Sequence, residues 1–306
     1  MKTVKFTSII LALCICFLSF CACSPSHTAL TVNSAPVSKG VFGYFLSVAV
    51  NSDEYREEEN KQEIASRLCA EYVAGLSLLK KHSVTLSPEE KVVVSSKVKT
   101  SWQLYSDFYN KYSVSKQDLC LMLEYEALTD ALTEKLYSKG GEREVNEEEV
   151  KAFFNQNYAA AKIAYTAFNR TMQESEVKDI TDKFTSMASV IRAGGEFSSA
   201  IEQYPDLAEF EDTEHIISAF DTSYPDGFFK NLAGIKTSDT QVMRFSRGIY
   251  LVQKADSQQF FDIYKSKCII KMKKEQVLSE ISALAETYKI EPDSSVIKNV
   301  MSSAGV

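Results

Sequence analysis

The feature that most constrains the fold is a nearly unbroken helical pattern that runs from Ser38 to Tyr158. Apolar residues recur there at the spacing of one helix face. The whole chain has only 11 Gly and 6 Pro among 306 residues, about half of the usual share of ~7% and ~5%. This scarcity excludes a collagenous, low-complexity or loop-dominated protein. The remaining composition is that of an ordinary globular chain, long enough for one large domain or for two to three smaller ones.

Cap signals divide this stretch into separate helices. Ser38 follows an expected pair of short strands and is a good N-cap. Ser87-Pro88-Glu89-Glu90 combines a capping residue, a proline at the first helical position and acids in the first turn, which is typical of a helix start. Ser115 and Asn146 give similar signals. We expect helices over residues 38–48, 53–82, 88–112, 115–139 and 146–158.

Beyond residue 161 the pattern changes to alternating strands and helices. Strands are expected at residues 163–167, 240–245 and 248–252, and helices at 172–193 and 197–204. The helical period returns over residues 258–288, and this late helix is expected to pack back on the N-terminal helices. The expected fold is therefore mostly α with an inserted small α/β domain. Residues 29–158 and 257–306 would build the helical domain, and residues 159–256 the inserted one.

The first residues have the layout of a secretory signal. Lys2 and Lys5 precede an uncharged apolar run over residues 6–22 that is slightly short for a transmembrane span. The run ends in Phe20-Cys21-Ala22-Cys23, which resembles a bacterial lipobox. We expect residues 1–22 to be the signal peptide, Cys23 to be the acylated N-terminus, and residues 23–28 to be a tether. The alternative is an uncleaved membrane anchor, and both interpretations place the rest of the chain outside the cytoplasm.

Charge and cysteine usage exclude several classes of partner and cofactor. The net charge of −7 becomes −9 without Lys2 and Lys5, which disfavours nucleic acid because binding to phosphates requires a basic surface. After removal of the signal only Cys23 and three widely spaced cysteines, Cys69, Cys120 and Cys268, remain. They form no CxxC or other metal-ligand pair. The sequence therefore predicts no metal site, no cofactor and no disulfide framework.

The order of these segments resembles that of the extracytoplasmic foldases of the SurA and PrsA type. Residues 30–46, 80–90, 114–138 and 145–154 resemble successive parts of the helical domain of that family, and Tyr288-Lys289-Ile290-Glu291-Pro292 its closing segment. Residues 160–255 resemble parvulin, with Gly194-Gly195-Glu196-Phe197 at its middle and Gly248-Ile249-Tyr250-Leu251 in its final strand. The resemblance implies a helical chaperone domain and a parvulin-like (PpiC-type rotamase) α/β domain.

The parvulin-like segment departs from the family at its active site. The two family histidines are best matched by Tyr165 and Tyr250, and the sequence contains only His27, His82 and His215. The glycine-rich turn of the family has no counterpart in residues 215–220. The resemblance then implies a divergent domain used for binding, with weak or no prolyl isomerase activity. The alternative is an active isomerase that uses Tyr165 and Tyr250, since a phenol both donates and accepts hydrogen bonds.

Three groups of side chains are candidates for binding. The resemblance implies an apolar pocket formed by Phe220, Phe228 and Phe229, and their alternative interpretation is core. A second group of aromatic residues follows helical spacing and is interpreted as core, or alternatively as the lining of a chaperone cleft: Trp102, Tyr105, Phe108, Tyr109 and Tyr112. Five lysines near the start of the last helix indicate a solvated face, or alternatively contact with an anionic membrane: Lys265, Lys267, Lys271, Lys273 and Lys274.

Taken together, the sequence predicts a lipid-anchored, extracytoplasmic foldase or chaperone. Its expected partners are unfolded or partly folded exported polypeptides, and it is expected to need no cofactor. Two alternatives remain open at this stage: an active parvulin-type peptidyl-prolyl isomerase, and a surface lipoprotein with one specific protein partner.

Overall fold

The computed structural model describes residues 27–306. The predicted signal peptide over residues 1–22, the predicted lipid attachment site Cys23 and most of the predicted tether lie outside the described residues. The described chain divides into two compact units. Residues 27–144 and 273–306 form the helical unit, and Val145–Met272 form the α/β unit. Between residues 27 and 306, no helix combines the length and the apolar character that crossing a bilayer requires.

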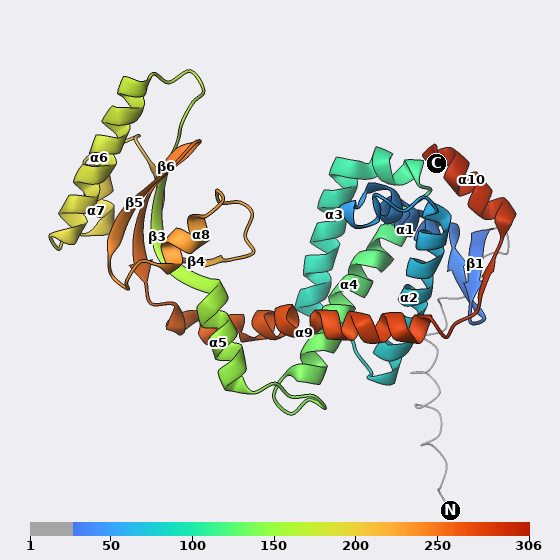
Figure 1. Cartoon of the computed structure of the whole chain (residues 1–306). Coiled ribbons are helices and arrows are strands. Elements are labelled where there is room, and N and C mark those ends of the chain that lie inside the picture. Colours follow the sequence, from blue (N-terminus) through green and yellow to red (C-terminus); the bar gives the residue numbers. More distant parts are fainter. Residues whose placement is uncertain (1–26) are drawn as a thin grey trace, which may run out of the picture. The chain divides into compact units, whose positions relative to one another are not determined.

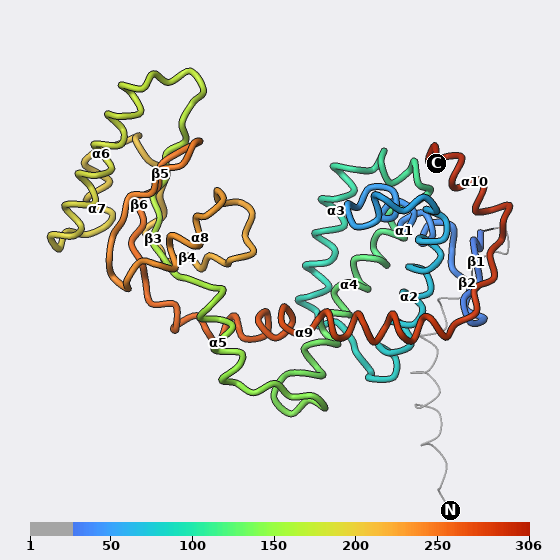
Figure 2. Tube along the Cα trace, in the orientation of Figure 1, coloured from blue at the N-terminus to red at the C-terminus, as the bar shows by residue number. Residues whose placement is uncertain are grey.

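The helical unit is formed by both ends of the described chain. Its small antiparallel sheet has the strand order β2-β1-β7, so that β1 (Thr28–Val32) lies between β2 (Ala35–Ser38) and β7 (Ile290–Pro292). In Figure 2 the blue strands β1 and β2 run beside the red segment that leads into the last helix. The helices of this unit are α1 (Lys39–Asn51), α2 (Lys61–Lys81), α3 (Pro88–Lys111), α4 (Lys116–Tyr137), the last part of α9 (Phe261–Ala285) and α10 (Ser294–Ala304).

Three predicted helix starts are confirmed by their hydrogen bonds. The Ser38 hydroxyl accepts the backbone N–H of Val41 at 3.2 Å. At α3 the Ser87 hydroxyl accepts the N–H of Glu90, and the Glu90 carboxylate accepts the N–H of Ser87 at 2.7 Å. The same reciprocal arrangement joins Ser115 and Asp118 at the start of α4. Each bond supplies a partner to an N–H that the first helical turn leaves free.

The single helix expected over residues 53–82 is wrong at its beginning. A short 3-10 helix over Asp53–Tyr55 is followed by a turn, and α2 begins only at Lys61. The Asn60 side chain caps α2 by accepting the N–H of Glu63 at 3.1 Å. The late helix expected over residues 258–288 is confirmed as α9, Phe261–Ala285. Strand β7 and helix α10, which were not expected, follow it and bring the end of the chain to β1.

The α/β unit is a four-stranded antiparallel sheet with helices on both faces (Figure 1). The strand order is β4-β3-β6-β5, and the strands comprise Glu209–Ser218, Tyr158–Ala167, Gly248–Ala255 and Thr240–Phe245 in that order. Helices α6 (Glu174–Arg192) and α7 (Phe197–Glu202) pack on one face, while α8 (Phe228–Ala233) packs on the other. The unit begins with α5 (Glu147–Asn157) and includes the first part of α9.

Strand alternation assigns neighbouring residues to opposite faces of this sheet. Ile249 and Leu251 belong to the core beneath α6 and α7, whereas Tyr250 and Val252 belong to the core beneath α8. Strand β4 was not expected, because its sequence EFEDTEHIIS lacks a regular alternation and only Ile217 is buried. It is an edge strand, and its acidic residues follow the common way in which proteins protect a sheet edge from further pairing.

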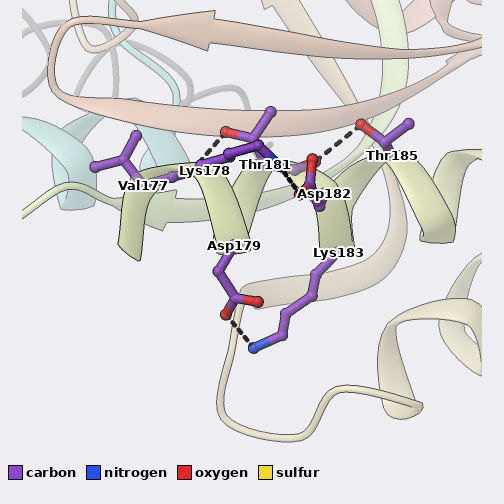
Figure 3. Close-up of polar contacts among 7 residues, drawn as sticks. All are labelled: Val177, Lys178, Asp179, Thr181, Asp182, Lys183 and Thr185. Atoms are coloured by element: carbon purple, nitrogen blue, oxygen red, sulfur yellow. Dashed lines mark hydrogen bonds and ion pairs between the residues drawn. The ribbon is translucent and has the colours of Figure 1, made fainter. Parts of the chain in front are cut away.

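Charged and hydroxyl side chains on the solvent-facing side of helix α6 have partners within the same helix. Figure 3 shows Lys178 directed at Asp182 and Lys183 at Asp179, each pair one helical turn apart and 2.6 Å between nitrogen and oxygen. The threonine hydroxyls on the same helix donate to backbone carbonyls four residues earlier, Thr181 to Val177 and Thr185 to Thr181. The opposite face of α6 is buried against the sheet.

Candidate functional site

Tyr165 and Tyr250 lie directly opposite each other on the central strands β3 and β6. Their ring centroids are 4.5 Å apart and their planes differ by 31°. Gly248 makes this arrangement possible, because a Cβ atom at that position would lie 2.5 Å from Cε2 of Tyr165. Burial, together with the phenols of Tyr165 and Tyr224, raises the pKa of Tyr250 to about 12. The Tyr250 hydroxyl therefore stays protonated at neutral pH and can donate a hydrogen bond.

Other aromatic rings enclose the Tyr250 side chain. The ring of Phe228 meets it edge to face at 4.9 Å, and that of Phe245 at 5.8 Å. Tyr224 stacks on Phe228 at 4.4 Å. Sequence reasoning missed Tyr224, which lies in the loop between β4 and α8; an aromatic residue just before Pro225 was the only signal available.

A cavity of about 410 Å³ lies beside this cluster, formed by the end of β4, the loop over residues 219–227 and the beginning of α8. The predicted residues Phe220, Phe228 and Phe229 all line it, together with Tyr224. Tyr165 and Tyr250 are not among its lining residues. The structure therefore brings the three phenylalanines to one cavity and places the tyrosine pair behind Tyr224 and Phe228.

The three phenylalanines differ in their surroundings. Phe228 is fully buried and Phe229 is half-buried, so both also serve the core beneath α8. Phe220 is exposed, and its ring stacks on Phe153 of α5 with the centroids 6.2 Å apart. The Lys271 ammonium lies 4.6 Å from the centroid of the same ring.

The lysines and histidines that the sequence singled out have ordinary contacts. Each of the five lysines lies against an aromatic ring or a carboxylate of its own unit: Lys265 at Glu147, Lys267 at Tyr264, Lys271 at Phe220, Lys273 at Tyr137 and Lys274 at Asp130. His215 lies 3.6 Å from the Glu211 carboxylate and 3.3 Å from the Thr213 hydroxyl. Within residues 27–306 no three His, Cys, Asp or Glu side chains gather as metal ligands would.

Helix α3 carries the second candidate site. Of its predicted aromatic stripe only Tyr112, just beyond the end of α3, is buried; Tyr105 and Phe108 are exposed, and Trp102 and Tyr109 are half-buried. The interpretation of this stripe as core is therefore wrong for most of its residues. The stripe stays partly open because α3 packs on α4 through Val94 and Val98, while Tyr105 interrupts the helical geometry with φ −132°.

The exposed apolar surface of the protein is concentrated on α3. Five of the nine large apolar side chains that are exposed among the described residues belong to this helix: Val92, Val93, Leu104, Tyr105 and Phe108. We call these five residues the α3 surface. Leu104 has 66% of its surface exposed, and Trp102 stacks on Tyr109 with the ring centroids 6.1 Å apart. Sequence reasoning missed Val92, Val93 and Leu104, which precede or interrupt the aromatic pattern.

Comparisons with known proteins give similarity at the level of structure. Neither a protein-family profile nor a curated protein sequence matches the chain. The structure is similar to that of foldase protein PrsA from Streptococcus pneumoniae, with 14% identity and a TM-score of 0.43 over 83% of this chain and 95% of the other. PrsA from Lactococcus lactis gives 14% identity and a TM-score of 0.42 over 90% and 98% of the two chains. A SurA-like chaperone of Campylobacter jejuni is 10% identical, with a TM-score of 0.31 over 88% of this chain and 99% of the other.

These similar structures are PrsA foldases and a SurA-like chaperone, the kind of protein that the motif order of this chain resembles. The predicted fold class is confirmed as well: the chain is mostly helical, with a small α/β unit inserted into a helical unit that both ends of the described chain build.

Proposed function

We propose that the protein is a membrane-anchored, extracytoplasmic foldase or chaperone that binds unfolded exported polypeptides, here called clients, and has weak or no prolyl isomerase activity. The observation that carries the proposal is the α3 surface, where five large apolar side chains are exposed on one helix. Single exposed apolar side chains are ordinary, but Leu104, Tyr105 and Phe108 lie within about one helical turn of each other. Exposed apolar side chains that gather in this way mark sites of interaction. An unfolded client exposes apolar segments that lose contact with water when they pack on this surface.

The experiment is an aggregation assay with an unfolded exported protein and residues 24–306 of this chain, which contain every described helix and strand. The variant Leu104→Asn/Phe108→Asn removes two apolar side chains of the α3 surface that are 66% and 39% exposed. We expect it to lose most of the suppression of aggregation, because burial of one such side chain contributes about 1.5–3 kcal/mol.

The matched control is Leu76→Asn/Ile263→Asn, whose side chains are 38% and 69% exposed but lie on α2 and α9. The control is expected to suppress aggregation like the unchanged chain. Equal activity of both variants would show that α3 does not bind clients. Capture of one specific folded partner in place of unfolded clients would instead favour the surface lipoprotein.

The anchor is a separate part of the proposal and concerns Cys23. A multiply acylated cysteine would hold the chain on the membrane, since each buried methylene contributes about 0.8 kcal/mol. Metabolic labelling with a fatty acid tests this part. We expect label on the unchanged chain and none on Cys23→Ser, and label that persists on Cys23→Ser would contradict the assignment.

The isomerase question is tested with Xaa-Pro peptides. Isomerisation requires a pocket that binds the twisted amide away from water, because the amide rotation barrier is ~18–20 kcal/mol. Tyr165 and Tyr250 do not line the cavity beside α8, which supports weak or no activity. We expect little acceleration over buffer, and the same rate for Tyr165→Phe/Tyr250→Phe. A large acceleration that this double variant abolishes would establish the active isomerase instead.

A further inference from the structure

The helical unit also contains a groove that no residue of α3 lines. It consists of two adjoining cavities of about 580 Å³ and 200 Å³ that share Phe45, Tyr125 and Leu278 as lining residues. The walls come from α1, α2, α4 and the last part of α9. The shared residues are half-buried, so part of each side chain faces the groove.

The floor of the groove is a fixed set of aromatic rings. Tyr72 meets Tyr125 edge to face with the ring centroids 4.9 Å apart, and Phe45 lies 6.1 Å from Tyr72. Gly75 lets the Tyr125 ring lie against α2, because a Cβ atom there would be 2.1 Å from the Tyr125 hydroxyl oxygen. Burial raises the pKa of Tyr72 to about 12 and also raises that of Tyr125, so both phenols stay neutral.

The two ends of the groove differ in character. The smaller cavity adds Tyr44, Met122, Thr129, Glu126 and Lys274 to the shared residues, so one carboxylate and one ammonium leave it without net charge. Methionine beside aromatic rings suits apolar side chains of varied shape. Lys274 is paired with Asp130 at 2.7 Å. The larger cavity is lined by four carboxylates, those of Glu54, Glu71, Glu275 and Glu286, and by one guanidinium, that of Arg67.

The charges of the larger cavity leave an excess of negative charge beside the rings. Arg67 lies over the ring of Tyr55, with 5.8 Å to its centroid. Glu71 accepts a hydrogen bond from the Ser282 hydroxyl at 2.9 Å. Among the described residues, none of the four glutamates forms a salt bridge. A cation in this cavity would therefore lie beside carboxylates, which attract it, and beside the aromatic residues Tyr55, Tyr72 and Tyr125.

We propose that this groove binds a client segment in which a Lys or Arg lies next to an apolar side chain. The apolar side chain occupies the end lined by Tyr44 and Met122, and the cation occupies the end lined by Glu275 and Glu286. This inference rests on the proposed client-binding function and names a class of segment that the protein selects. The α3 surface supplies contact with apolar segments in general, while the groove adds a preference for basic ones.

The test is a binding experiment with two labelled, unstructured peptides that differ at one position. One carries Lys between two Leu residues, and the other carries Gln in its place. Fluorescence anisotropy with residues 24–306 should give about fivefold tighter binding of the Lys peptide, which is the range of partly exposed charge interactions. The preference should decrease at high salt, because the cavity is open to solvent.

Two charge-matched variants locate the preference. Glu275→Gln/Glu286→Gln keeps the size of both side chains and should bring the two peptides to nearly equal affinity. Glu58→Gln/Glu59→Gln removes the same charge from exposed residues that do not line the groove, and should keep the preference. A preference that the first variant leaves unchanged, or no preference at all, would overturn the inference.

The aggregation assay distinguishes this failure from failure of the proposed function. If the unchanged chain suppresses aggregation but binds both peptides equally, client binding stands and the groove proposal is wrong. If the chain neither suppresses aggregation nor binds either peptide, the proposed function fails and the groove proposal fails with it.

Discussion

Helices α3 and α6 are both long, but α6 buries most of its apolar residues and α3 leaves most of its own exposed or half-buried. The 19 residues of α6 bury Ile180, Phe184, Met187, Ala188 and Ile191, and ion pairs satisfy its outer face (Figure 3). The 24 residues of α3 bury only Val94 and Val98. Of the ion pairs found in the described chain, none involves a residue of α3, although it carries Lys91, Lys97, Lys99 and Lys111.

The number of packing partners explains the difference. Helix α6 lies against α7 and the strands β5 and β6, so its apolar face is covered on several sides. Helix α3 makes its main contact with α4. Its remaining apolar residues contribute little to the stability of the fold, and they are available to bind something else. Helices of similar apolar content can therefore bury that content in one place and leave it exposed in another.

The largest expected effect tests the buried side of this comparison. Phe184→Ala should lower the free energy of unfolding by about 3–5 kcal/mol, because the side chain is fully buried beneath the sheet. Phe108→Ala on α3 should cost less than about 1 kcal/mol, since Phe108 is exposed. Urea unfolding of both variants measures the two values. Similar losses would show that α3 is held by packing as α6 is.

The next effect concerns how α3 is held in place. With few buried residues, α3 depends more on its capped beginning, where Ser87 and Glu90 form a reciprocal capping box. Ser87→Ala should therefore lower stability by about 1 kcal/mol. Ser96→Ala, an exposed position within the same helix, is the control and should cause no loss. Thermal unfolding distinguishes the two, and an unchanged midpoint for Ser87→Ala would contradict the expectation.

A smaller effect depends on pH and concerns the part of α9 in the helical unit. The Arg143 guanidinium, 2.7 Å away, lowers the pKa of Glu280 from its ordinary value of 4.5. A carboxyl group whose pKa is lower in the folded state stabilises the fold at pH values above its pKa in the unfolded chain. This contribution disappears as the pH falls through the pKa of the folded state. Glu280→Gln should therefore cost at most about 1 kcal/mol near pH 7. The cost should vanish in acid, and urea unfolding at pH 7 and below pH 4 checks it; a loss independent of pH would argue against the pair.

The smallest effect tests the charged faces. Asp179→Asn breaks the ion pair with Lys183 on α6 and should cost about 0.2–0.5 kcal/mol in dilute buffer. High salt should remove that cost, because exposed charges are screened. Lys97→Gln on α3 removes a lysine that forms no ion pair within residues 27–306, and it should cost nothing at either salt concentration. A salt-sensitive loss for Lys97→Gln would reveal a partner on α3.

Local signals predicted much of the fold. The capping residues Ser38, Ser87 and Ser115 begin helices as expected, since a cap depends on residues within one turn. Strands β4 and β7 were missed, because an edge strand with little alternation and a three-residue strand depend on distant partners. Asn60 was a local signal that the longer helical pattern obscured.

The residues of the candidate sites also divide into those that the sequence predicted and those that depend on distant segments. The pocket residues Phe220, Phe228 and Phe229 could be named from the resemblance, and they do line one cavity. That Tyr165 and Tyr250 lie behind Tyr224 and Phe228 follows from the fold of the loop over residues 219–227, which no short motif described. The groove of the helical unit was not foreseen, because its walls combine residues 44–72 with α4 and with residues 274–286, three segments that lie far apart along the chain.

The order of amino acids alone determined where most helices begin, because a hydroxyl or carboxylate finds its N–H partner within three or four residues. It also determined that the chain would be mostly helical, since Gly and Pro are scarce. Only the tertiary structure decided which apolar faces are covered. Burial depends on neighbours contributed by distant segments, and α3 lacks the partners that α6 has. The aromatic stripe that the sequence predicts as core is therefore left largely exposed.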